Sequence, residues 1–314
     1  MYVLYAYMIG SVAMGCTLGC ELDVGIVIML PHSKVYLFVV SALLIAVFLV
    51  QQKSTSLEEW FQDFRKGHCR SEQIYFSREI FELQTKLYQH QQLSRQNVLA
   101  RSNQMAQISN AYVAEVNCPH LVRLGDPDDG GKWVCNPWKL PRKCVVYSLG
   151  VGNDVSFERD VNFVTESRCE IISFDNYPHL DHKFKEFTNV KFKPWLIATD
   201  TDENKLKYSV QDIMKKFGHK QIDILKLDIE GHEFTVIPDL LNRGIKPCHI
   251  LIEIHKGQPR RMMDLLKVFA THKYFNAAKE LNGYRPNLIE FSFIHELCLS
   301  TYNVPPPMHR NLAV

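Results

Sequence analysis

The stretch 222–233, Ile-Asp-Ile-Leu-Lys-Leu-Asp-Ile-Glu-Gly-His-Glu, places an apolar strand directly before a group of ionisable side chains. Asp228, Glu230 and Glu233 follow the strand together with a glycine and a histidine. A sheet holds acids at a strand end rigidly, and a glycine beside them lets a ligand or another backbone approach closely. A second strand end of this kind lies upstream at residues 147–154 (YSLGVGND). The two together predict an α/β sheet with a ligand across its carboxyl edge.

Strands and helices alternate from residue 117 onward, which is typical of βαβ units and a mostly parallel sheet. The reversal expected at Asn282-Gly283 makes the last two strands an antiparallel pair. The pattern predicts seven strands, at 144–149, 170–174, 190–194, 222–227, 249–254, 274–279 and 288–294. It predicts helices at 156–165, 178–186, 206–217, 233–241 and 260–271.

The N-terminal part of the chain is strongly apolar. Residues 35–50 are apolar except for Ser41, and a helix over 30–52 is long enough to cross a bilayer. Met29 and the short basic region after it have the layout of a signal anchor. We therefore expect an apolar extension over 1–28 that precedes a candidate start at Met29, or forms a second apolar segment. We further expect a transmembrane anchor over 30–52, a helical stem over 53–116 and a domain over 117–314. The domain is expected to be lumenal (Golgi or ER) or extracellular.

Composition narrows the classes of partner. The chain is 46% apolar and 22% charged with a net charge of +2, so no nucleic-acid partner is expected. Nine cysteines without a CxxC pair argue against a structural zinc site. Cys118 and Cys135 bracket a glycine-rich turn, and they either form a disulfide in an oxidising lumen or stay reduced and buried.

The first two strand ends are candidates for a nucleotide site. Gly150 and Gly152 let the backbone turn tightly and approach a ligand, although a plain strand-to-helix turn also uses such glycines. Asp175 ends the next strand, where an acid can accept both hydroxyls of a ribose. The alternative for Asp175 is a turn or cap role before Pro178.

The later strand ends are candidates for the chemistry. Asp228 and Glu230 have no obvious structural role, whereas Glu233 begins a helix whose dipole favours an acid. Glu253 and His255 end the adjacent strand, within reach of Asp228. A histidine beside carboxylates is a general base, a metal ligand or half of a structural hydrogen bond. Nothing further in the pattern supports a metal, so none is expected.

These motifs resemble a known family. Residues 117–297 are similar to the class I S-adenosylmethionine-dependent methyltransferases, because they contain in order the motifs SLGVGND, FDN, DILKLDIEGHEF and LIEIH. The stretch Asp228-x-Glu230-Gly231-x-Glu233 resembles the hallmark of the FkbM-type group. The stretch 126–135 (DPDDGGKWVC) and the anchor resemble single-pass methyltransferase-like proteins of animals.

The resemblance implies a Rossmann-like seven-stranded sheet of order 3-2-1-4-5-7-6 with flanking helices, and S-adenosylmethionine as cofactor. It implies that Gly150 and Gly152 lie under the cofactor and that Asp175 binds its ribose. The family usually has an acid two residues before the first glycine, where this chain has Ser148, so Asn153 or Asp154 is expected to take that role. The expected cofactor site is thus made of Ser148, Gly150, Gly152, Asn153, Asp154, Asp175, Asn176 and Asp228.

The function expected from these observations is a membrane-anchored methyltransferase that O-methylates a sugar or another small molecule. His255 is the expected base, Glu253 orients it, and Asp228 and Glu230 line the cleft. A catalytically silent, membrane-tethered interaction module is the alternative, and Ser148 is its main support. A nicotinamide-dependent oxidoreductase is disfavoured, because the third glycine of the dinucleotide fingerprint is missing.

Overall fold

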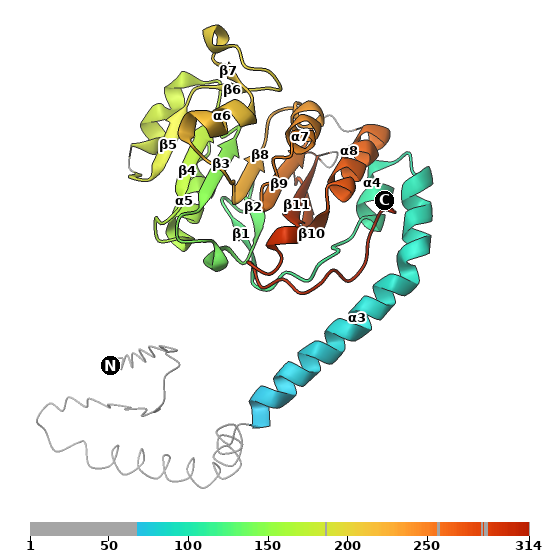
Figure 1. Ribbon diagram of the computed structural model, residues 1–314. Helices are drawn as coiled ribbons and strands as arrows, with labels where there is room; N and C mark the ends of the chain where they lie inside the picture. Colours follow the sequence, from blue (N-terminus) through green and yellow to red (C-terminus); the bar gives the residue numbers. More distant parts are fainter. Residues whose placement is uncertain (1–67, 186, 256–257, 284, 286–287, 314) are drawn as a thin grey trace, which may run out of the picture. The chain divides into compact units, whose positions relative to one another are not determined.

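A computed structural model describes residues 68–313 except 186, 256–257, 284 and 286–287 (Figure 1). The chain divides into two units, Met1–Gln73 and Ile74–Val314, and every described strand belongs to the second. The expected segments 1–28 and 30–52 lie outside the described residues. In the part that is described, no helix is both long enough and apolar enough to cross a membrane.

A seven-stranded sheet forms the centre of the domain, in the order β10-β11-β9-β8-β3-β4-β5. When only these seven strands are numbered in chain order, leaving out β1, β2, β6 and β7, this order is 3-2-1-4-5-7-6. The pairs β3–β4, β3–β8, β4–β5 and β8–β9 are parallel, and β11 pairs antiparallel with both β9 and β10. The strands are β3 (Val145–Leu149), β4 (Glu170–Phe174), β5 (Val190–Lys193), β8 (Ile224–Leu227), β9 (His249–Ile254), β10 (Tyr274–Leu281) and β11 (Ile289–His295).

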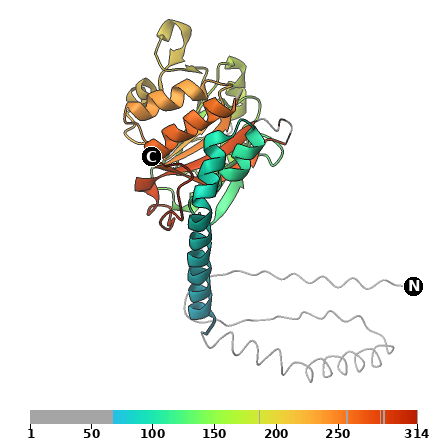
Figure 2. The same ribbon diagram turned by 90° about the vertical axis from the view of Figure 1, so that its right-hand side faces the viewer.

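Both faces of the sheet are buried, because successive side chains of a strand point to opposite faces. Tyr147 and Leu149 of β3 join one apolar cluster, and Val146 between them joins the other. Helices α4, α6, α7 and α8 supply the first cluster, and α5, η2 and a hairpin supply the second (Figures 1 and 2). The helices are α3 (His68–Arg101), α4 (Met105–Ala111), α5 (Ser156–Val164), α6 (Val210–Phe217), α7 (Glu233–Asn242) and α8 (Pro259–Thr271).

Short elements complete the domain. The antiparallel hairpin of β1 (Leu121–Leu124) and β2 (Lys132–Cys135) contacts the main sheet through β2, and β6 (Leu196–Ile197) pairs with β7 (Lys207–Tyr208). The 3-10 turns are η1 (Pro137–Lys139), η2 (Pro178–Phe184), η3 (Glu203–Lys205) and η4 (Glu296–Cys298).

Two predicted helices were wrong in part. The helix expected over 178–186 is the 3-10 turn η2. The helix expected over 206–217 begins only at Val210, because the Ser209 hydroxyl accepts the N–H of Asp212 and so caps it there. Leu206 has a φ of 51° and ends the turn before that cap.

The end of the expected stem packs into the domain. Leu99, Ile108 and Tyr112 are buried in the core, and the Tyr112 ring meets Phe291 of β11 edge-on. The Glu115 carboxylate is buried and accepts the N–H groups of Asn276 and Asn311. The hydrophobic core therefore begins before residue 117.

Three disulfides tie the domain together. Cys118 is bonded to Cys135, the pair that the sequence left open. The pairs Cys144–Cys169 and Cys248–Cys298 were not indicated by sequence spacing. Each of the last two joins segments that are distant along the chain and adjacent in the sheet.

We expect these six cysteines to resist maleimide in protein that has been denatured without reductant, because denaturant exposes a buried thiol but leaves a disulfide intact. Reduction should make all six reactive by mass spectrometry. Loss of Cys248–Cys298, which closes a 50-residue separation, should lower the free energy of unfolding by about 4 kcal/mol. Labelling of the denatured, unreduced protein at these positions would contradict the pairing.

Candidate functional site

A cavity of about 1090 Å³ lies at the carboxyl edge of the sheet. Residues that follow β3, β4 and β8 line it, together with the end of β9 and the segment at Trp195. Crevices at this edge are the usual ligand sites of open α/β sheets. The structure therefore brings most of the predicted site residues to one place, namely Gly150, Gly152, Asn153, Asp154, Asp175, Asn176, Asp228, Glu230, Glu253 and His255.

The two glycines after β3 have different roles. Gly150 has a φ of 75°, and a Cβ there would lie 1.7 Å from the carbonyl oxygen of Asp228. Gly150 is thus required for the close approach of the β3 and β8 ends. Gly152 also has a positive φ, of 59°, but nothing lies within 4 Å of the place of its Cβ. Its open side belongs to the cavity.

Asp175 fixes the glycine loop. Its Oδ2 accepts the N–H groups of Val151 and Gly152 at 3.0 and 2.8 Å. Its Oδ1 accepts the N–H of Tyr177 at 3.1 Å, as a turn acid does. The turn role and the place beside the glycine loop therefore coexist, and the carboxylate still lines the cavity.

The other predicted cofactor residues take varied positions. Asp154 receives the N–H and the hydroxyl of Ser156 and so holds the start of α5. Asn153 lines the cavity and accepts the Lys183 ammonium at its backbone carbonyl. Asn176 lines the cavity as an exposed residue.

Ser148 does not line the cavity. Its side chain is fully buried beside the carboxylate of Glu158, which projects from α5. Burial raises the pKa of Glu158, and the nearby Lys226 ammonium opposes the rise. Lys226 also donates to the carbonyl of Gly150 at 3.0 Å. The acid missing at position 148 is thus present under the loop, on a helix.

The turn after β8 separates Glu230 from Glu233. Glu230 has a φ of 54°, which residues other than glycine rarely adopt, and its side chain is 73% exposed. Glu233 is fully buried, and its Oε1 accepts the N–H of Ile229 at 3.1 Å. Glu233 therefore belongs to the site, although its place at a helix start gave it a structural explanation in the sequence.

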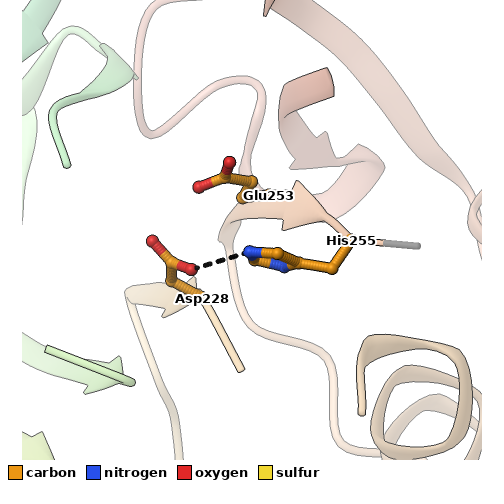
Figure 3. Close-up of side chains that lie close together, drawn as sticks. All are labelled: Asp228, Glu253 and His255. Atoms are coloured by element: carbon orange, nitrogen blue, oxygen red, sulfur yellow. Dashed lines mark ion pairs between the residues drawn. The ribbon is translucent and has the colours of Figure 1, made fainter. Parts of the chain in front are cut away.

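His255 lies between three carboxylates. Its Nδ1 is 2.9 Å from Glu233 Oε1. Its Nε2 is 3.4 Å from Asp228 Oδ1 (Figure 3). Glu230 Oε1 lies 3.9 Å from the same Nε2. Burial alone would lower the pKa of His255, but the hydrogen bond and charge of Glu233 outweigh it and raise the pKa to about 9. The carboxylates around His255 therefore favour the protonated form of the imidazole.

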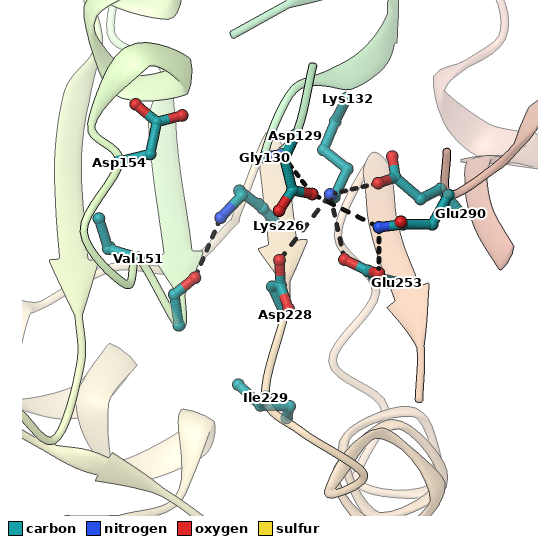
Figure 4. A network of polar contacts seen from close by, with 12 residues as sticks. Asp129, Gly130, Lys132, Val151, Asp154, Lys226, Asp228, Ile229, Glu253 and Glu290 are labelled. Atoms are coloured by element: carbon teal, nitrogen blue, oxygen red, sulfur yellow. Dashed lines mark hydrogen bonds and ion pairs between the residues drawn. The ribbon is translucent and has the colours of Figure 1, made fainter. Parts of the chain in front are cut away.

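A buried lysine joins the acids on the other side (Figure 4). Lys132 Nζ lies 3.0 Å from Glu290 Oε1, 3.7 Å from Glu253 Oε2 and 3.9 Å from Asp228 Oδ2. Burial would lower the pKa of Lys132, but these carboxylates raise it overall. Burial and the Asp228 charge raise the pKa of Glu253 to about 7. Burial would also raise the pKa of Asp228, but the charges of Lys226, Lys132 and His255 outweigh burial and lower it.

Sequence reasoning missed both lysines of this cleft. Lys132 follows a glycine pair in the hairpin, and Lys226 is the one charged residue inside the run Ile224–Leu227. Burying a lysine within an apolar strand costs free energy unless it has a partner, so Lys226 was a sign of a buried acid nearby. Glu253 and Glu290 face each other across β9 and β11, and Lys132 offsets their repulsion.

We expect Glu233→Gln to lower the pKa of His255 below its value of about 9, because the anion that receives Nδ1–H is removed. In the native protein the raised pKa contributes stability that is complete below about pH 6.5 and is lost as the pH rises through 9. NMR titration of the His255 ring in metal-free buffer measures the shift. An unchanged pKa in the variant would show that Glu233 does not hold the proton.

Known proteins place the chain in a family. A family model described as a methyltransferase domain matches residues 76–295, more than half of the chain. The human "Probable methyltransferase-like protein 24" is 27% identical over 132 residues, and its rat counterpart is 26% identical. These matches cover 38% of this chain and 34% of the relatives, so the chain spans about a third of the curated proteins it matches.

Solved structures give a looser likeness. The fibrillarin pre-rRNA processing protein of Methanococcus jannaschii is 12% identical with a TM-score of 0.37, over 56% of this chain and 83% of that one. A TehB-like SAM-dependent methyltransferase from Corynebacterium glutamicum is 13% identical with a TM-score of 0.30, over 50% and 82%. The family match over residues 76–295 is decisive: this chain belongs to the methyltransferase-domain family.

Proposed function

We propose that this protein is an S-adenosylmethionine-dependent methyltransferase of the FkbM type. One observation carries the proposal. The same cavity is lined by Gly152 with the free space beside it, by the Asp175 carboxylate and by the Asp228–His255 pair. The family match makes the oxidoreductase alternative unnecessary.

The glycine loop and the β4 end fit the cofactor. The unobstructed space beside Gly152 admits a ligand against the backbone, where a side chain would stand in the way. Asp175 lies next to that space and keeps acceptor capacity for ribose hydroxyls, since an ionised carboxylate has about four acceptor positions. Asn153 and Asn176 add polar groups to the same wall.

The chemistry would occur at the ends of β8 and β9. The cofactor, held by the glycine loop and Asp175, would supply a methyl group on a cationic sulfur. The exposed carboxylate of Glu230, 3.9 Å from His255 Nε2, would receive the hydroxyl proton of the acceptor. Asp228 and His255 Nε2 face this part of the cleft and can orient the acceptor. The raised pKa of His255, caused by Glu233 and the other carboxylates, disfavours the expected role of this residue as a free base at neutral pH.

The acceptor we propose is a sugar or another small hydroxylated molecule. Asp129, Glu230 and Glu253 line the cleft, and Asn282 adds an amide. Such a wall offers acceptors to hydroxyl groups, and its acids outnumber the cationic Arg285, so it disfavours the phosphates of nucleic acid.

We further propose a lumenal or extracellular domain tethered to a membrane by residues 30–52. The apolar run supplies the tether, and three disulfides support an oxidising compartment, since such bonds are rare where thiols are kept reduced. Thiol labelling of protein trapped in intact cells tests this placement, and free thiols at these cysteines would argue against it.

The second candidate function is a silent methyltransferase fold that serves as an interaction module. Ser148 supports it, because the usual acid is absent from the cavity wall and Glu158 lies beneath the loop. Cofactor binding separates the two candidates.

We expect Gly152→Ala to weaken S-adenosylmethionine binding by about tenfold or more, because the new methyl group enters the cofactor space. Isothermal calorimetry measures the affinity. Gly218→Ala is the matched control: its φ of 74° is equally unfavourable for alanine, and its Cβ also meets nothing, but it ends α6 outside the cavity.

Both variants should lose about 1 kcal/mol of stability from the left-handed backbone, and only Gly152→Ala should lose affinity. Equal affinities for the two variants would place the cofactor elsewhere. Absence of binding to the unmodified protein would favour the interaction module.

We expect His255→Ala to reduce methyl transfer by about 100-fold or more while the Kd for S-adenosylmethionine changes little, because the imidazole faces the acceptor side. Labelled cofactor and a fractionated metabolite extract provide the transfer measurement. Unchanged turnover in this variant would remove His255 from the reaction.

A further inference from the structure

Three possible metal ligands meet where β8 and β9 end (Figure 3). Asp228, Glu253 and His255 each offer a donor atom, and these atoms lie within 4.8 Å of one another. His255 Nε2 and Asp228 Oδ1 are 3.4 Å apart, close to the separation of about 3 Å between adjacent ligands of an octahedral ion. The sequence pattern gave no support for this site.

The histidine is held as a metal ligand would be. Glu233 receives the Nδ1–H group at 2.9 Å, which fixes the ring and leaves Nε2 to face Asp228. Histidines that bind metals almost always have such a partner on the other nitrogen. Glu233 is fully buried, so this orientation does not depend on solvent.

The charges around the site leave room for a dication. Four carboxylates with little exposure gather here, those of Asp228, Glu233, Glu253 and Glu290. Lys132 contacts three of them, and Lys226 acts on Asp228 from a greater distance. Coordination of an ion at Nε2 would displace the His255 proton to solvent, and the four ionised carboxylates would then exceed the two ammonium groups by two negative charges. An uncompensated buried charge is costly, so a cation is favoured.

Glu290 provides an independent sign of this imbalance (Figure 4). Its side chain is 7% exposed, and Oε1 contacts Lys132 while Oε2 has no hydrogen-bond partner among the described residues. A donor atom of Glu290 lies within 4.8 Å of donor atoms of Glu253 and of Asp129. A buried carboxylate oxygen without a hydrogen-bond partner therefore borders the three ligands.

We propose that the cleft binds one divalent cation, Mg²⁺ or Mn²⁺, through Asp228, Glu253 and His255. Carboxylate oxygens, which supply two of the three ligands, are suited to these ions, and the absence of cysteine disfavours a thiophilic metal. Three protein ligands leave positions open toward the cavity.

The proposed methyl transfer lacks a free imidazole base, because the protonated form of His255 is favoured, and a bound ion would resolve this difficulty. This part of the inference rests on the proposed function. An ion bound to His255 makes the imidazole a ligand, not a base, and lowers the pKa of a coordinated acceptor hydroxyl. Two neighbouring oxygens of the acceptor can occupy two open positions, so adjacent hydroxyls are the favoured substrate class. The exposed carboxylate of Glu230, near Nε2, then receives the hydroxyl proton and passes it to solvent.

The test uses MnCl₂ and the full-length protein in detergent, without cofactor. Electron paramagnetic resonance counts free Mn²⁺, and we expect one bound ion per chain. Asp228→Asn and His255→Ala should each weaken binding by about tenfold or more. Bound Mn²⁺ should also broaden the NMR signals of His255, and those of the distant His272 should persist.

Asp239→Asn is the control, because Asp239 pairs with Arg243 away from the cleft. Melting temperatures show whether a variant is folded, and Glu253→Gln gives a second nearly isosteric ligand change if Asp228→Asn unfolds. Absence of binding at 1 mM Mn²⁺, or binding that both ligand variants retain, would overturn the site. Mn²⁺ binding without S-adenosylmethionine binding would refute the proposed function and leave the cation site standing.

Discussion

The buried ammonium of Lys132 is the contact on which the cleft depends. It comes from the β1–β2 hairpin and reaches acids on β9 and β11 and the acid that follows β8. Glu253 and Glu290 lie directly opposite each other, so without this cation their repulsion would oppose the pairing of β9 with β11. The hairpin is in turn held by Cys118–Cys135 and by the bond from the Cys135 N–H to His249. A disulfide in a peripheral hairpin thereby supports the centre of the cleft.

The loss of the usual acid at Ser148 acquires a physical meaning from Glu158 and Lys226. The carboxylate of Glu158 is buried under the glycine loop, and Lys226 lies between it and the Gly150 carbonyl. An acid in this position acts on the loop through the lysine and has no direct access to the cavity. The loop geometry is thus preserved by a buried pair, while the surface that a cofactor would meet has one negative charge fewer. Such a change alters affinity more readily than it alters the fold.

Sequence patterns predicted the sheet and the edge that carries the site, because apolar strands followed by acids are visible in a linear chain. They placed Asp228, Glu253 and His255 together correctly, since adjacent parallel strands end side by side. They did not predict Lys132 as the partner of these acids, because its contacts join residues more than 90 positions apart. The same limit applies to Cys248–Cys298 and to Tyr112, whose burial against β11 makes part of the expected stem belong to the core.

Glu233 shows how one residue can satisfy two explanations. An acid in the first turn of α7 is favourable to the helix, and this made its presence unremarkable in the sequence. The structure turns the same carboxylate inward, where it holds the His255 ring and raises its pKa. Burying that charge has a cost that a helix dipole of at most about 2 kcal/mol does not offset by itself. The contact with His255 offsets the rest of this burial cost, so the orientation of the ring and the burial of Glu233 depend on each other.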